Sequence, residues 1–77
     1  MVIKVLGPGC FNCQKLEALA RKAVDELGLD AEIIKVTDYA DIMAYGIMST
    51  PGLVVDEKVK IAGFVPSLDQ VKTALQV

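Results

Sequence analysis

VIKVLGPGCFNCQKLEALA, residues 2–20, joins a short apolar run to an amphipathic one through a Gly-Pro-Gly turn. Residues 2–6 predict a buried strand, because short β-branched runs bounded by glycine and proline are typical of strands. The apolar side chains of residues 11–27 recur with the period of one helix face, and Gly28 supplies a helix end. The stretch therefore predicts a strand, a tight turn and a helix in succession.

The turn carries Cys10 and Cys13, the only two cysteines of the chain. The first turn of a helix has unpaired N–H groups and a partial positive charge, and both favour a thiolate over a thiol. In C-x-x-C motifs at helix starts the pKa of the nucleophilic cysteine falls from about 8.5 to about 3.5–7.5. Such a thiolate attacks a disulfide, and the second cysteine resolves the mixed disulfide. The Gly7-Pro8-Gly9 turn leaves the approach to Cys10 clear.

The middle of the chain contains one more strand and one short helix. Residues 32–36 form an apolar run that is typical of a strand. Thr37 or Asp38 is a suitable N-cap for a helix that extends to about Tyr45 and ends at Gly46. Because a helix joins the first two strands, we expect these strands to be parallel, with a right-handed crossover.

The next segment predicts a hairpin. Pro51 starts its first strand, since the first position of a strand tolerates proline, and the apolar run at residues 53–55 continues it. A tight turn at residues 56–57 leads into a strand at residues 58–62. Two lysines alternate there with apolar residues, as expected of an edge strand with one solvent-facing side, and the alternation puts Val59 on the buried side.

A final helix completes the element order. Ser67 and Gln70 have the spacing of a capping box, and an apolar helix face follows it. The order β-α-β-α-β-β-α predicts a single α/β domain over residues 1–77, with a four-stranded mixed sheet and flanking helices.

Composition limits the classes of function. The chain has 77 residues, 53% of them hydrophobic, and a net charge of −2, so it has no basic surface for nucleic acid. No apolar run approaches the roughly 18–20 residues that span a bilayer. The first residues are predicted to form a strand, so we expect no signal peptide. The absence of histidine excludes Cys-His and Ser-His-Asp catalysis. We therefore expect a cytoplasmic protein without nucleic-acid or membrane partners, in a compartment where structural disulfides are rare.

Three other interpretations of the cysteine pair stay open. The cysteines could be core residues, since free cysteine is often buried. They could bind a soft metal, Cu(I) or Zn(II). However, small Cu(I) carriers have the order β-α-β-β-α-β, and a structural zinc site needs four ligands, so we expect no metal. A redox-sensing interaction domain would oxidise reversibly without catalytic turnover.

Three segments resemble the small, glutaredoxin-sized thioredoxin-like proteins of archaea and bacteria: GPGCFNC after the first strand, STPG before the hairpin and AGFVPS before the last helix. The resemblance covers essentially the whole chain and implies a minimal thioredoxin fold. It implies that Cys10 is the exposed attacking cysteine and Cys13 the more buried resolving one. Pro51 matches the proline that is cis in this fold and faces the cysteine pair. The backbone of Thr50 matches the position that pairs with a substrate segment as an added strand.

The sequence departs from larger relatives around the cysteines. Gly9 stands where full-size thioredoxins have a tryptophan, and Phe11-Asn12 stands where they have Gly-Pro. Gly9 and Phe11 are therefore further candidates for substrate binding. Thioredoxins also have a buried acid below the second cysteine, whereas this strand offers only Lys4, so the group that takes the proton from Cys13 is left open.

We therefore expect a thiol-disulfide oxidoreductase that reduces protein disulfides and cycles between a dithiol and a Cys10–Cys13 disulfide. No bound cofactor is implied, because the two cysteines carry both electrons. An upstream donor that resembles thioredoxin reductase would regenerate the dithiol, and we expect a monomer. The candidates for an apolar rim that contacts partners are Phe11, Ile47, Met48 and Phe64.

Overall fold

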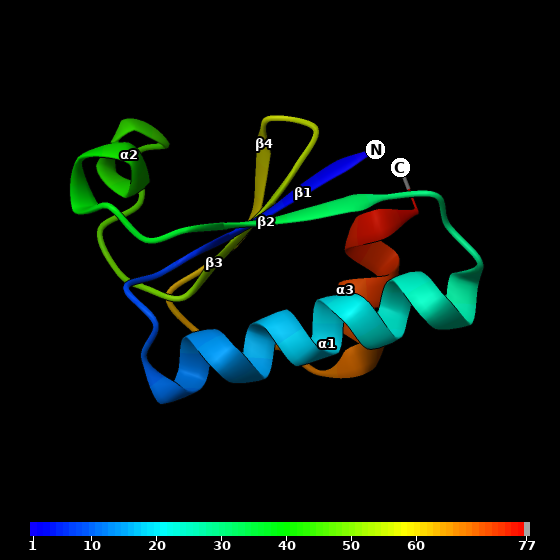
Figure 1. The fold of residues 1–77 in the computed structure, drawn as a ribbon. Helices are drawn as coiled ribbons and strands as arrows, with labels where there is room; N and C mark the ends of the chain where they lie inside the picture. The colour runs from blue at the N-terminus through cyan, green and yellow to red at the C-terminus, as the bar shows by residue number, and fades with distance from the viewer. Residues whose placement is uncertain (77) are drawn as a thin grey trace.

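The computed structural model describes residues 1–76, which form a four-stranded sheet flanked by helices (Figure 1). The predicted element order and fold class are confirmed. The elements are β1 (Val2–Leu6), α1 (Phe11–Leu27), β2 (Glu32–Val36), α2 (Tyr39–Ala44), β3 (Gly52–Val55), β4 (Lys58–Ala62) and α3 (Leu68–Leu75). Strand β3 begins at Gly52, one residue after the predicted start at Pro51. Val77, the last residue of the predicted domain, lies outside the described residues.

The strand order β2-β1-β3-β4 makes β1 and β3 the central strands. Strands β1 and β2 are parallel, as predicted, whereas β3 pairs antiparallel with both β1 and β4. Leu6 at the end of β1 lies opposite Gly52 at the start of β3. The segment that follows β1 and the segment that precedes β3 are therefore neighbours at the end of these two central strands.

The sheet has a different cover on each face. Helices α1 and α3 lie side by side on one face, and α2 lies on the other side near the end of β2 (Figure 1). Ile3 and Val5 belong to the larger core cluster, with α1 and α3. Leu6 and Val54 belong to a smaller cluster with Ile42 of α2. Within residues 1–76, no helix combines the length and the apolarity that crossing a membrane requires.

The helix ends follow local capping chemistry. Gly28 ends α1 with φ at 65°, in the left-handed region that favours glycine. Asp38, one of the two predicted N-caps, accepts a hydrogen bond from the Ala40 N–H at 2.8 Å. The predicted capping box opens α3, because the Gln70 N–H donates to Ser67 Oγ at 3.2 Å and the Ser67 N–H donates to Gln70 Oε1 at 2.8 Å.

Strand β4 departs from the predicted alternation at a bulge. Leu53 pairs with Ile61 whereas Val54 pairs with Val59, so Lys60 is an extra residue between the two pairs. The extra residue moves Val59 onto the other face of the sheet from Ile61, where it is 40% exposed. The prediction that Val59 is buried was therefore wrong.

Because of the bulge, Val54 is buried whereas its cross-strand partner Val59 is exposed. The same substitution should therefore change the free energy of unfolding by different amounts at the two positions. Val54→Thr places a hydroxyl in a fully buried site, so we expect it to lower the free energy of unfolding by about 1–3 kcal/mol. Val59→Thr should change it by no more than about 0.5 kcal/mol, because the new hydroxyl remains hydrated. Urea denaturation of both variants measures the difference, and equal losses would contradict the bulged register.

Candidate redox site

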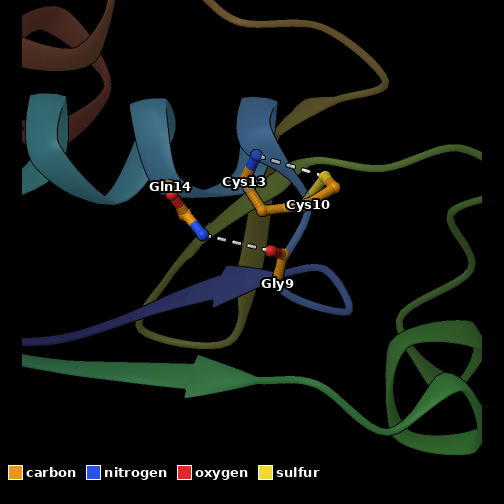
Figure 2. Close-up of a disulfide and its surroundings, with 4 residues drawn as sticks. All are labelled: Gly9, Cys10, Cys13 and Gln14. Carbon is orange, nitrogen blue, oxygen red and sulfur yellow. Dashed lines mark hydrogen bonds between the residues drawn. A yellow bond between two sulfur atoms is a disulfide. The ribbon is translucent and has the colours of Figure 1, made fainter.

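Cys10 and Cys13 form a disulfide at the N-terminus of α1, with their Cα atoms 5.0 Å apart (Figure 2). Cys10 is the N-cap residue, and its Sγ accepts a hydrogen bond from the Cys13 N–H at 3.3 Å. Negative charge on this sulfur is stabilised once the disulfide opens, because the unpaired N–H groups and the positive end of the helix dipole lie against it. Cys10 is exposed, whereas Cys13 is only 5% exposed. The two sulfurs of the disulfide therefore differ in their access to a reaction partner.

The turn between β1 and α1 brings the backbone against the Cys13 side chain. The Gly7 N–H donates to the Val36 carbonyl at 2.9 Å, which ties the turn to the end of β2. A Cβ at Gly7 would overlap Cys13 Sγ, so this position requires glycine. Gly9 has φ at 94°, and its carbonyl accepts a hydrogen bond from Gln14 Nε2 at 3.3 Å (Figure 2). The turn is therefore fixed both to the sheet and to the helix that it precedes.

Thr50 lies beside the Gly7 turn that packs against Cys13, and Pro51 follows it at the entrance to β3. The Thr50 Cβ is 3.8 Å from the point where a Gly7 Cβ would lie, the same point that the Cys13 side chain crowds. The Thr50–Pro51 peptide bond is cis, and the Pro51 carbonyl accepts a hydrogen bond from the Gly63 N–H at 2.8 Å. The structure thus brings two distant parts of the chain together at one edge of the sheet.

The candidate rim residues do not share one environment. Phe11, the first residue of α1, is 70% exposed, and the Lys15 ammonium lies 4.6 Å from the centroid of its ring. Met48 is fully exposed and Phe64 is about half exposed. Ile47, by contrast, is buried in the smaller core cluster and belongs to the interior. Three of the four side chains are therefore accessible to a partner.

Lys4 lies on the side of the sheet opposite α1, because its neighbours Ile3 and Val5 point into the α1–α3 cluster. Its Nζ donates hydrogen bonds to Glu57 Oε1 and Tyr45 Oη, each at 2.6 Å. These hydrogen bonds raise the pKa of Lys4 above its ordinary value, and the bond from Lys4 lowers the pKa of Glu57. Lys4 therefore ties β1 to the end of α2 and to the hairpin turn, away from the cysteines.

A cleft of about 100 Å³ opens beside Cys13, between α1, the preceding turn and the end of β2. Glu17 of α1 and Lys35 of β2 line it together with Cys13. Glu17 was not among the predicted site residues, although its four-residue spacing from Cys13 puts both on one face of the helix. The described chain, residues 1–76, holds no group of three or more His, Cys, Asp or Glu side chains suited to a metal ion.

The chain is similar to proteins of one family over residues 1–76. The model of the family described as "Thioredoxin domain" matches residues 1–76. A thioredoxin from Methanothermobacter thermautotrophicus is 47% identical over 75 residues, which cover 97% of this chain and 97% of that protein. A thioredoxin from Methanocaldococcus jannaschii is 40% identical over 76 residues, which cover 99% of this chain and 87% of that protein.

The contact between Gly7 and Cys13 predicts a coupled effect on stability. In the reduced protein, we expect Gly7→Ala to lower the free energy of unfolding by about 1–3 kcal/mol, because the new methyl group displaces Cys13 Sγ. The same change should cost less in a Cys13→Ala background, where that sulfur is absent. Chemical denaturation of the four proteins in reductant completes the double-mutant cycle. An equal loss of free energy of unfolding in the two backgrounds would show that the new methyl group does not act through Cys13 Sγ.

Proposed function

Because this chain belongs to the thioredoxin domain family and is a thiol-disulfide oxidoreductase with a Cys10–Cys13 redox disulfide, we propose that Cys10 is the nucleophile and Cys13 the resolving cysteine in the reduction of protein disulfides. The observation that carries this proposal is the asymmetry of the pair. Cys10 is exposed at the helix N-cap, whereas Cys13 is buried one turn into the helix. A substrate sulfur therefore has direct access to Cys10 alone.

The reaction proceeds in two exchanges. The Cys10 thiolate attacks one sulfur of the substrate disulfide, and the other substrate sulfur leaves as a thiolate that takes a proton from water. Cys13 then loses its proton and attacks Cys10 Sγ in the mixed disulfide. The Cys10–Cys13 bond forms, the bond between Cys10 and the substrate breaks, and the second substrate sulfur leaves. Two electrons have passed from the dithiol to the substrate.

The substrate segment next to the reacting sulfur binds along the entrance to β3. The backbone of Thr50 pairs with that segment as an added strand, and Pro51 forms part of the surface next to it. Gly9 leaves space for the segment, since no atom lies within 4 Å of the point where a Gly9 Cβ would be. Phe11, next to Cys10 in the sequence, contributes an exposed apolar surface.

An electron donor has to return the two electrons after each cycle. We propose that an upstream reductase of the thioredoxin-reductase type supplies them in the cytoplasm, where such a donor keeps thiols reduced. One chain contains both cysteines and the Thr50–Pro51 segment, so the protein acts as a monomer.

The roles of the two cysteines predict unequal alkylation. In the reduced protein at slightly acidic pH, we expect iodoacetamide to modify Cys10 at least about tenfold faster than Cys13, because the helix start stabilises the Cys10 thiolate. Peptide mass analysis of timed samples gives both rates, and the Cys13→Ser and Cys10→Ser variants give each rate alone. Faster modification of Cys13 would reverse the proposed roles. Cysteines that react only after a chelator is added would favour a metal-binding module.

The proposed contact with Phe11 predicts a substrate-size effect. We expect Phe11→Ala to raise the KM for a protein disulfide such as insulin by about fivefold, which corresponds to about 1 kcal/mol of lost contact. The rate with a small nitrobenzoate disulfide should stay unchanged, because that substrate does not extend beyond Cys10. Val59→Ala, which removes an exposed apolar group from β4, is the matched control. If the KM of Phe11→Ala equals that of the unmodified protein, Phe11 does not contact the protein substrate.

A further inference from the structure

Resolution of the mixed disulfide requires Cys13 to lose a proton in a buried position. A thiol is a poor nucleophile until it is deprotonated, and burial disfavours the charged form. The cleft of about 100 Å³ beside Cys13 offers that proton an exit. Its volume is comparable to that of about three water molecules. A short water path can therefore join the sulfur to a proton acceptor on the wall of the cleft.

Glu17 is the one carboxylate that lines this cleft in the described chain. Its side chain is 18% exposed and lies one helical turn beyond Cys13, on the same face of α1. Its Oε2 accepts hydrogen bonds from Arg21 Nε at 3.1 Å and from Arg21 Nη2 at 3.0 Å. Its Oε1 lies 3.6 Å from Lys35 Nζ, beyond ordinary hydrogen-bond distance. Oε1 is therefore the oxygen with free lone pairs for a donor in the cleft.

The charges around Glu17 keep it ionised. The hydrogen bond from Arg21 lowers the pKa of Glu17, and the Lys35 ammonium lowers it further against the opposing effect of partial burial. The other polar groups of the cleft are poorer acceptors. Lys35 carries no lone pair as an ammonium, and the hydroxyl of Thr37 and the amide of Gln14 are far weaker bases than a carboxylate. The lowered pKa makes Glu17 a weaker base than an ordinary carboxylate, but it keeps Glu17 ionised at neutral pH and so able to accept a proton and release it to water.

We propose, on the basis of the roles assigned above to Cys10 and Cys13, that Glu17 is the proton acceptor for the Cys13 thiol, through water in the cleft. The Cys13 S–H bond breaks and the proton passes to Glu17 Oε1. The Cys13 thiolate attacks Cys10 Sγ, and the substrate sulfur leaves with the electron pair of the broken bond. Glu17 then releases the proton to bulk water, with which its partly exposed side chain is in contact. The Lys35 ammonium, 3.6 Å from Glu17 Oε1, offsets the single negative charge that moves from Glu17 to Cys13 Sγ.

A nitrobenzoate disulfide separates the two exchanges in a stopped-flow experiment. The reduced protein should release one coloured thiolate when Cys10 attacks and a second when Cys13 resolves the mixed disulfide. We expect Glu17→Gln to slow the second release by about tenfold or more, since a positioned proton acceptor typically contributes about 100-fold or more, and to leave the first release unchanged. The Cys13→Ser variant, which should release only the first equivalent, identifies the two phases.

Two controls separate proton transfer from a structural role of the Glu17 ion pairs. Arg21→Gln removes the ion pair with Glu17 but keeps the carboxylate, so its second release should stay within about twofold of the unmodified protein. Glu26→Gln removes a different ion pair of α1, with Lys72, outside the cleft. Added formate at constant pH and ionic strength should restore the second release in Glu17→Gln, because a small carboxylate can replace the missing acceptor. It should have no effect on the unmodified protein.

Each outcome has a distinct meaning. Equal second releases in Glu17→Gln and in the unmodified protein would overturn the inference alone, and so would a loss of equal size in Arg21→Gln. A slowed variant that formate does not restore would make Glu17 a structural residue. Two releases from Cys13→Ser would overturn the proposed roles of the cysteines, and the inference with them.

Discussion

The redox site depends on the close approach of the Gly7 backbone to the Cys13 side chain. Gly7 leaves the sheet directly after β1, and its N–H is bonded to the end of β2, so its position is fixed by two strands. The absence of a Cβ there lets Cys13 pack against the turn, and this packing sets the first turn of α1. The N–H groups of that turn then face Cys10. Because Gly7 has no Cβ, the sheet fixes the position of the first turn of α1, and this turn then stabilises negative charge on the exposed sulfur of Cys10.

The sequence predicted those parts of the fold that local chemistry determines. The helix periods, the cap at Gly28 and the capping box at Ser67 are short-range signals, and each has the predicted place in the structure. The bulge at Lys60 has no such signal, since lysines and apolar residues alternate through the whole of β4. The bulge puts Val59, and not Lys60, opposite Val54, on the face of the sheet that carries α2. This choice of partner depends on contacts between strands, which the pattern of one strand does not record.

The same distinction applies to the site. The chemistry of Cys10 and Cys13 follows from their place at a helix start, which the sequence shows directly. The nearness of Thr50 follows instead from the antiparallel pairing of β1 and β3, so only the family resemblance pointed to it. Ile47 shows a third case, because a loop sequence does not separate buried from exposed apolar residues. Its Cδ1 lies 2.8 Å from the point where a Gly52 Cβ would be, so a glycine in β3 makes the space that buries it.

The direction of the β1 side chains explains why a helix, and not this strand, supplies the carboxylate near Cys13. Val5 is the β1 residue that lines the cleft, whereas Lys4 points to the opposite face and is held there by Glu57. An acceptor for the Cys13 proton therefore has to come from α1 or β2, and the position one turn beyond Cys13 carries Glu17. This position reaches the cleft and the solvent together, because the helix runs along the surface of the domain. Glu17 is held ionised by Arg21 and Lys35 and its side chain is in contact with solvent, so it passes the proton to water before the next cycle.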